Sequence, residues 1–167
     1  MKIDLRPIKE GDLKYIEKSL KNNSLPWLNG KKLGEQKKGN PIWLIAWKDK
    51  EPIGHVQLRL TGSTSLEVKG KLRKCPHLET LYVKEKYRKQ GVGTQIMNFC
   101  EKLISKKYYN KLGLAVEKEN KFLWTLYHKR GYQDWGMGFV TETWQEVHEN
   151  KIKNVSHKCN YLIKKLK

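Results

Sequence analysis

Cysteine is scarce in this chain, and its spacing excludes the scaffolds that cysteine usually builds. The three cysteines, Cys75, Cys100 and Cys159, are an odd number and form no C-x-x-C pair, which argues against a disulfide framework and a zinc site. The histidines show no metal-ligand spacing either, so we expect no bound metal. The sequence therefore predicts a cytoplasmic protein that keeps its thiols reduced.

Long apolar stretches are also missing. The longest uninterrupted run covers residues 42–47, six in all, whereas a membrane-spanning helix needs about 18 or more apolar residues. Residues 1–7 do not contain the apolar segment of a secretory signal. We therefore expect neither a membrane partner nor export.

Acidic residues and arginine are both few, while lysine is abundant. The 167 residues include 35 Lys and Arg but only 17 Asp and Glu, a net charge of +18. Five of the 35 are Arg, and the excess is spread evenly: 17 basic and 9 acidic residues (+8) over 1–83, then 18 and 8 (+10) over 84–167. A nucleic-acid binder usually concentrates its basic residues and uses Arg. The even lysine coat argues against a nucleic-acid partner and favours an anionic ligand over a polycationic one.

Length and hydrophobic periodicity predict a single α+β domain over residues 1–167. Strands are expected at residues 3–6, 42–47, 53–60, 78–83, 112–116, 139–144 and 159–166, and helices at 12–20, 91–106 and 121–130. Residues 22–41, with at most a broken helix, and 61–75 are expected to be loops, and the last two strands enclose a charged connection. Along the chain, antiparallel hairpins come first and alternating strands and helices follow. This order predicts a mixed, mostly antiparallel twisted sheet of six to seven strands flanked by about four helices.

The segment over residues 81–94, LYVKEKYRKQGVGT, is the most informative one. A strand ends, a basic turn follows, and Gly91 and Gly93 open a helix. Free backbone N–H groups at a helix N-terminus form an anion site, and glycine lets a phosphate approach the backbone. A G-x-G pair alone is also typical of any glycine-rich helix start. Ile96 replaces the third glycine of the dinucleotide motif, and no Walker pattern occurs.

Two motifs resemble those of the GNAT N-acetyltransferase superfamily. Arg88-x-x-Gly91-x-Gly93 after a strand is similar to its acyl-CoA pyrophosphate loop. The second match begins with Asn120, continues through Leu126-Tyr127 and ends at Gly131-Tyr132, like the family's N-x-x-A-x-x-L-Y-x-x-x-G-[FY] helix. The motifs lie within residues 78–132. Leu123 replaces the family's usual Ala, which either narrows the cofactor groove or reshapes its acyl end.

The resemblance implies a GNAT-like fold with acetyl-CoA as co-substrate. The backbone of Leu81 and Val83 would pair with the pantetheine arm as an added strand. Asn120 would hydrogen-bond the cofactor, or it only caps the helix. The pyrophosphate would be held by the basic side chains and backbone N–H groups of Arg88, Lys89, Gln90, Gly91, Val92, Gly93 and Thr94.

The same resemblance implies transfer of the acetyl group to a primary amine by direct attack in a ternary complex. Tyr127 is the candidate acid for the leaving thiolate; the alternative is an aromatic that packs on the sheet. An alkyl amine with a pKa near ~10.4 must lose a proton before it attacks. His77 or Glu79, expected to share a strand face with Leu81 and Val83, is the candidate base, with water as the alternative.

The acceptor side is less defined by the sequence. The resemblance places Trp27, which follows the first helix, at the substrate pocket. Trp135 and Trp144 either line the same groove or, as the alternative, pack in the core. The acceptor is a small-molecule or protein amine, and a homodimer is left open. Two other function classes remain: a non-catalytic acyl-CoA-binding sensor or interaction module on the same fold, and a basic nucleic-acid-binding domain, for which no motif is present.

Overall fold

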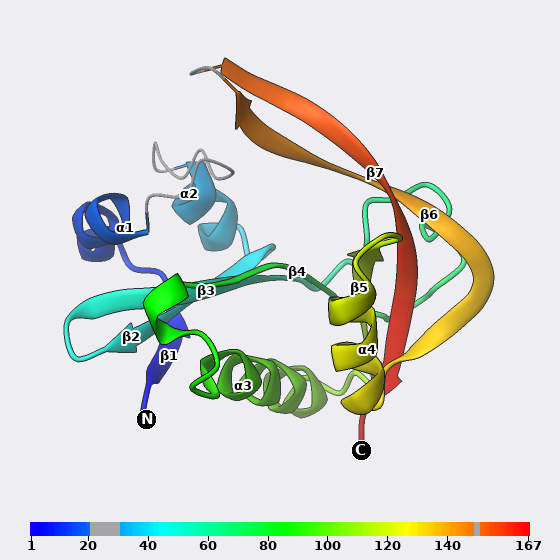
Figure 1. Ribbon diagram of the computed structural model, residues 1–167, viewed down its shortest axis with the longest axis horizontal. Helices are drawn as coiled ribbons and strands as arrows, with labels where there is room; N and C mark the ends of the chain where they lie inside the picture. The colour runs from blue at the N-terminus through cyan, green and yellow to red at the C-terminus, as the bar shows by residue number, and fades with distance from the viewer. Residues whose placement is uncertain (21–30, 149–150) are drawn as a thin grey trace.

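The computed structural model describes residues 1–20, 31–148 and 151–167, and their core is a seven-stranded mixed sheet in the order β1-β2-β3-β4-β5-β7-β6 (Figure 1). This confirms the predicted α+β class. The elements are β1 (Asp4–Pro7), α1 (Leu13–Ser19), α2 (Lys31–Lys37), β2 (Ile42–Lys48), β3 (Glu51–Arg59), β4 (His77–Val83), α3 (Val92–Lys106), β5 (Lys111–Glu117), α4 (Lys121–Lys129), β6 (Gln133–His148) and β7 (Lys151–Lys165), with short 3-10 helices η1 (Glu10–Asp12) and η2 (Glu85–Tyr87).

Helices cover both faces of the sheet (Figure 1). On one face, α3 and α4 bury residues such as Ile96, Cys100 and Tyr127 against the strands. On the other face, α1 and α2 pack against β2 in a second cluster. Since β3 lies between the two layers, it is buried at every inner position, including the polar residues His55 and Gln57.

The sheet opens between β4 and β5, the one parallel pair among the described strands. Only two residue pairs join these strands, His77 with Gly113 and Leu78 with Leu114. β5 then continues along β7, whereas the β5-facing edge of β4 beyond Leu78 has no strand beside it. The divergence leaves unpaired backbone groups at the centre of the sheet, where an extended ligand can bind them.

A β-bulge in β4 decides which side chains reach this opening. Thr80 has a positive φ of 53°, and the register against β3 shifts here. The extra residue exchanges the two faces of the strand: Leu81 and Val83 pack toward α3, whereas His77 stacks on the opposite face. The prediction that His77, Glu79, Leu81 and Val83 share one face is therefore wrong.

The last two strands are longer than predicted. Instead of strands at residues 139–144 and 159–166, β6 and β7 form a hairpin of 16 and 15 residues. It extends away from the body of the molecule (Figure 1). Its backbone pairs without interruption from Phe139–Asn160 to His148–Lys151, and this pairing extends β6 beyond residues 139–144, whose Thr, Val and Trp favour a strand by themselves. The loop expected over 22–41 contains α2.

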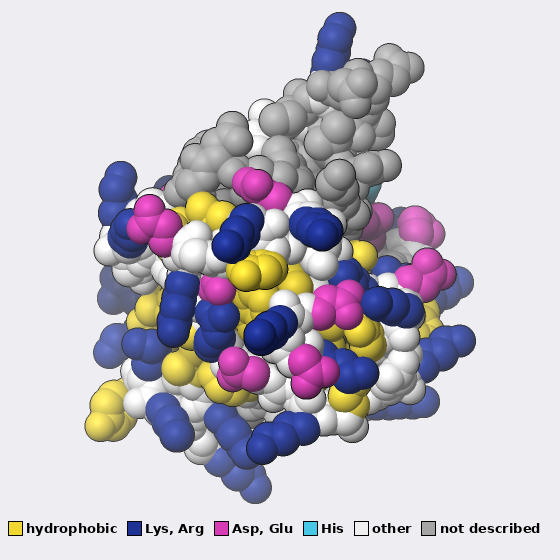
Figure 2. Space-filling model, turned by 90° about the vertical axis from the view of Figure 1, so that its left-hand side faces the viewer, with side chains coloured by type: hydrophobic (Ala, Val, Ile, Leu, Met, Phe, Trp, Pro, Cys, Tyr) yellow, Lys and Arg dark blue, Asp and Glu magenta, His cyan; other side chains and the backbone are white. Residues whose placement is uncertain are grey.

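On the side of the molecule that Figure 2 shows, charged side chains are dispersed rather than clustered. Figure 2 shows Lys and Arg side chains scattered over one side of the molecule with Asp and Glu between them. No helix of the described residues is long and apolar enough to cross a membrane.

Candidate active site

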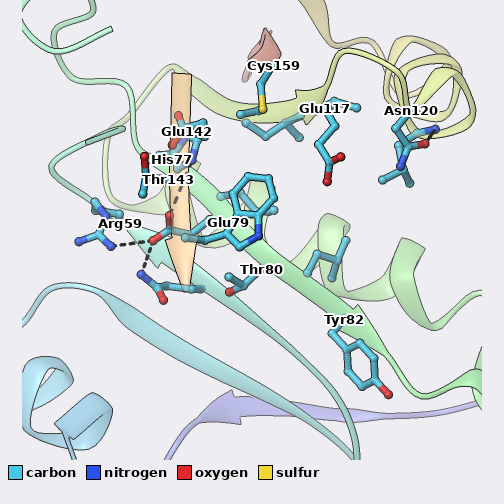
Figure 3. A pocket seen from close by; sticks show the side chains of 18 of the residues that line it. Arg59, His77, Glu79, Thr80, Tyr82, Glu117, Asn120, Glu142, Thr143 and Cys159 are labelled. Atoms are coloured by element: carbon cyan, nitrogen blue, oxygen red, sulfur yellow. Dashed lines mark hydrogen bonds and ion pairs between the residues drawn. The ribbon is translucent and has the colours of Figure 1, made fainter. Parts of the chain in front are cut away.

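A pocket of about 530 Å³ occupies the opening between β4 and β5 (Figure 3). β3, β4, β5, α4 and β6 contribute to its walls, including Glu79, Asn120, Tyr127 and Glu142. In Figure 3, Glu79 lies near the middle, with Arg59 and Asn120 on opposite sides of it. The pocket therefore brings together residues that lie more than sixty positions apart in the chain.

The start of α3 forms an open anion site beside β4. Gly91 occupies the N-cap position with φ 78°, and no side chain caps the helix. The first hydrogen bond runs from the Gln95 N–H to the Gly91 carbonyl at 3.0 Å, so the N–H groups of the first turn precede the helical ladder. No atom lies within 4 Å of a Cβ built on Gly91 or Gly93. The site is thus open to a phosphate-sized ligand.

Arg88 joins the anion site to the end of β4. Its Nε donates to the Val83 carbonyl at 3.0 Å, and its guanidinium carbon lies 5.9 Å from the centre of the Tyr82 ring. Lys89 is held with a positive φ of 57°, and Gln90 Nε2 donates to the Lys86 carbonyl at 2.8 Å. These contacts fix the basic turn that the sequence predicted.

A carboxylate that sequence reasoning missed also holds this turn. Glu51, at the start of β3, accepts hydrogen bonds from Lys84 Nζ at 2.7 Å and Tyr87 Oη at 2.6 Å. Lys86 Nζ lies 3.0 Å away. Hydrogen bonds from Lys84 and Tyr87 lower the pKa of Glu51 to about 2. The cluster joins two segments more than thirty residues apart, so no local pattern in the sequence signals it.

The second motif lies on α4 and faces the pocket. Asn120 is its N-cap, with Oδ1 accepting from the Leu123 N–H at 3.0 Å. The capping alternative is therefore seen in the structure, while the side-chain NH₂ group remains a donor for a second partner. Asn120, Leu123 and Tyr127 all line the pocket.

Tyr127 lies at the floor of the site, 7% exposed. Its ring packs edge-on against Tyr132, with ring centres 5.8 Å apart. Burial raises the pKa of Tyr127, so the phenol is protonated at neutral pH and can donate a proton. Its ring belongs to the core and also lines the pocket, so packing and a catalytic role are compatible.

On the opposite side, Glu79 and His77 differ in their surroundings. Glu79 Oε1 accepts from Arg59 at 2.7 Å and from Gln57 Nε2, while Oε2 lies 3.9 Å from His77 Nε2. His77 is 2% exposed, and its Nδ1 lies 3.2 Å from the hydroxyl of Tyr161. Burial lowers the pKa of His77, so its imidazole is neutral.

Glu142 on β6 lines the pocket together with Glu79 and Glu117, and sequence reasoning missed it. It is 7% exposed, and its Oε1 accepts from Ser63 Oγ at 2.8 Å. Burial raises the pKa of Glu142 to about 7, and the nearby charges of Glu79 and Glu67 act in the same direction. One signal existed: Glu142 lies two residues after the buried Val140, so alternation along the expected strand at 139–144 places both side chains on one face.

The remaining predicted residues have different outcomes. Trp27 lies outside the described residues, so its role at the substrate pocket stays a prediction. Trp144 lines the pocket and stacks on His157 with ring centres 4.2 Å apart. Within the described residues, no three His, Cys, Asp or Glu side chains are placed to hold a metal ion.

A sheet that opens between two parallel strands, next to a glycine-led helix start, defines the class of acyl-CoA-dependent acetyltransferases. Residues 12–132 match the model of the acetyltransferase (GNAT) family. The chain belongs to this family.

Solved structures of the same fold span nearly the whole chain. The PaiA N-acetyltransferase of Thermoplasma acidophilum, in complex with coenzyme A, is 17% identical, with a TM-score of 0.63 and 99% of each chain covered. A GNAT family acetyltransferase of Elizabethkingia anophelis, with acetyl-CoA bound, is 18% identical, with a TM-score of 0.62 and 98% of each chain covered. A GNAT acetyltransferase of Streptococcus pneumoniae is 16% identical, with a TM-score of 0.63 and 99% and 100% coverage. None of the curated proteins matches the chain.

Proposed function

We propose that the protein is an N-acetyltransferase that moves the acetyl group of acetyl-CoA to a primary amine by direct attack in a ternary complex. The observation that carries this proposal is the opening between β4 and β5, which leads to the uncapped start of α3. The bound CoA and acetyl-CoA in two structures of the same fold support the choice of co-substrate.

In this proposal the cofactor lies along the unpaired edge of β4. The backbone of Leu81 and Val83 pairs with the pantetheine arm. Asn120 donates from its free side-chain NH₂ group. The pyrophosphate lies at the positive end of α3. It is held there by the backbone N–H groups and basic side chains of the turn and the first helical residues, which are Arg88, Lys89, Gln90, Gly91, Val92, Gly93 and Thr94.

The acetyl transfer needs few protein groups. The neutral amine attacks the thioester carbonyl carbon, the C–S bond breaks, and Tyr127 gives its proton to the departing thiolate. The nitrogen loses a proton to water as the amide forms, and water returns a proton to Tyr127. The Lys84 N–H donates to Ile53 on the β3 side, so strand alternation directs the Val83 N–H toward the opening. There it can stabilise the oxygen on which negative charge develops.

The amine enters from the side of the pocket that Glu79 occupies. Arg59 and Gln57 fix the Glu79 carboxylate, and we assign it the catalytic role of holding the amine against the thioester. Trp27 is proposed to contact the acceptor, a small-molecule or protein amine. The three cysteines are free and buried, which fits a reducing compartment such as the cytoplasm.

A non-catalytic acyl-CoA sensor on the same fold is the alternative. The protonated Tyr127 phenol in the pocket favours the enzyme, because a sensor has no need of a proton donor beside the cofactor.

Screening amines with acetyl-CoA tests the proposal. The panel comprises phenethylamine, lysine, glutamate, a peptide with a free N-terminus and, as a polycation, an aminoglycoside. CoA release is followed with a thiol reagent. Burial raises the pKa of Cys75 to about 11 and of Cys159 to about 12, so these thiols add little background. We expect amine-dependent release with at least one neutral or anionic acceptor. Tight acetyl-CoA binding without release for any amine would support the sensor.

A further inference from the structure

We propose that Glu142 is the general base of the reaction: it accepts the proton that the acceptor ammonium loses before attack. This inference rests on the proposed function and adds a catalytic residue to it. Glu142 comes from β6, and Asn120 begins α4, the helix that carries Tyr127. Figure 3 shows Glu142 and Asn120 on different sides of the pocket. The pocket wall thus offers a proton donor on one side and a proton acceptor on the other.

The placement of Glu142 differs from that of Glu79. Arg59 and Gln57 both donate to Oε1 of Glu79, so Glu79 is held in an ion pair with Arg59, and its Oε2 lies 3.9 Å from His77 Nε2. Within the described residues, the hydrogen-bond partner of Glu142 is the neutral hydroxyl of Ser63, which occupies only Oε1. Oε2 is therefore the oxygen that remains for an ammonium group entering the pocket.

Charged and titratable groups approach Glu142 from each element packed against it. Those that act on it directly are Glu67 of the loop over residues 61–76, Arg59 of β3, Glu79 of β4, and Cys159 and Tyr161 of β7. His157 of β7 is its strand partner, and His77 of β4 and Glu117 of β5 line the same pocket. Arg59 favours the ionised carboxylate, whereas burial and the charges of Glu79 and Glu67 oppose it. The balance is a pKa of about 7, the range in which a base is most effective near neutral pH.

The proton step balances with the groups already named. An ammonium N–H donates to Glu142 Oε2 and its proton moves to that oxygen, which frees the nitrogen lone pair for the thioester carbon. The C–S bond then breaks and Tyr127 protonates the leaving thiolate, while the attacking nitrogen loses its second proton to water as the amide forms. Water returns a proton to the Tyr127 phenolate, and Glu142 gives its own proton to water at the pocket mouth after the product leaves.

Glu142 has a structural role as well, and the test must separate the two. With Ser63, and with the bond from the Thr141 N–H to Glu67 Oε1 at 3.1 Å, it fastens the loop over 61–76 to β6. Glu142→Gln keeps an oxygen that accepts from Ser63 but cannot take a proton. Glu67→Gln is the matched control, because Glu67 fastens the same loop without lining the pocket.

The experiment measures kcat/KM against pH for the fastest acceptor of the amine panel, using the full chain. For the wild-type protein, the logarithm of kcat/KM should rise with pH at unit slope and level off at a break near pH 7. Glu142→Gln should lose this break and about 10²–10⁴ in rate, with unchanged acetyl-CoA binding. The Ser63 hydroxyl stabilises the ionised carboxylate, so Ser63→Ala should keep the maximal rate and move the break to higher pH. Glu67→Gln removes a negative charge and should leave the break in place or move it to lower pH.

A second readout does not depend on turnover. With ¹³C-labelled glutamate side chains, one carboxyl signal should titrate near pH 7 in wild type and be absent from Glu142→Gln. The proposal is overturned if Glu142→Gln keeps the wild-type profile, or if Glu79→Gln removes the break instead. A wild-type protein that acetylates none of the amines refutes the proposed function, and the role of Glu142 with it.

Discussion

Replacing Gly91 by alanine separates the strain at the start of α3 from its use as an anion site. Gly91 has φ 78°, and no atom lies within 4 Å of the added Cβ. The cost to the free protein is therefore conformational, about 1–2 kcal/mol for an L-residue in the left-handed region. At about 2–4 °C per kcal/mol for a chain of this size, Tm should fall by roughly 2–8 °C.

Gly93→Ala should act in the opposite direction on the free protein. Gly93 lies within the first turn of α3, it has no positive φ, and nothing lies within 4 Å of its Cβ. Alanine in a helix is favoured over glycine by roughly 0.5–1 kcal/mol. We expect a small rise in Tm, yet both variants should bind acetyl-CoA more weakly, because each adds a methyl group where the pyrophosphate approaches.

Thermal melts with and without acetyl-CoA measure both effects. A ligand at 100 times its Kd adds about 2.7 kcal/mol, roughly 5–10 °C here; a tenfold weaker Kd at the same concentration leaves about 1.4 kcal/mol, half the shift. Gly70→Ala is the matched control, since Gly70 has φ 85° with open space around it but lies in another loop. It should lower Tm and keep the full ligand shift. An undiminished shift in both Gly91→Ala and Gly93→Ala would refute the anion site.

Two further predictions concern single side chains. Tyr127→Phe keeps the ring that packs on Tyr132 but loses the proton donor, so kcat should fall by roughly 10²–10⁴ with little change in acetyl-CoA binding; near-normal turnover would assign the proton to water. Because the pKa of Glu51 is lowered to about 2 in the folded state, its stabilisation is present above its ordinary pKa and is lost as the pH falls toward 2. Glu51→Gln should therefore unfold more easily than wild type in urea at pH 6 and equally easily near pH 2, and a pH-independent difference would contradict the ion-pair cluster.

Local sequence patterns were enough to predict α3 and α4, the two helices that the proposal places beside the cofactor. Val92, Ile96, Cys100 and Ile104 of α3 are buried because their spacing places them on one helix face, whereas Phe99 at the margin of that face is exposed. The helix start after Gly91 and the cap at Asn120 depend on adjacent residues, so the sequence indicates them directly.

The acceptor side depends on contacts that no local pattern contains. The bulge at Thr80 lies where β4 remains paired with β3 but is no longer paired with β5. It places the residues after Thr80 on the face opposite to the one that simple alternation predicts. Glu142 becomes a pocket residue only because a 16-residue strand and the distant Ser63 enclose it. Pairing with β7 extends β6 beyond the residues whose composition alone favours a strand.

Transfer of a labelled acetyl group tests the central claim most directly. The protein is mixed with carbonyl-¹³C acetyl-CoA and the fastest acceptor of the panel; NMR follows the labelled carbonyl, and mass spectrometry follows the protein during the first turnover. Direct transfer predicts one labelled amide for each CoA released and a protein that never gains an acetyl group. Release of CoA without a labelled amide, or an acetylated protein that later passes the group to the amine, would contradict the account.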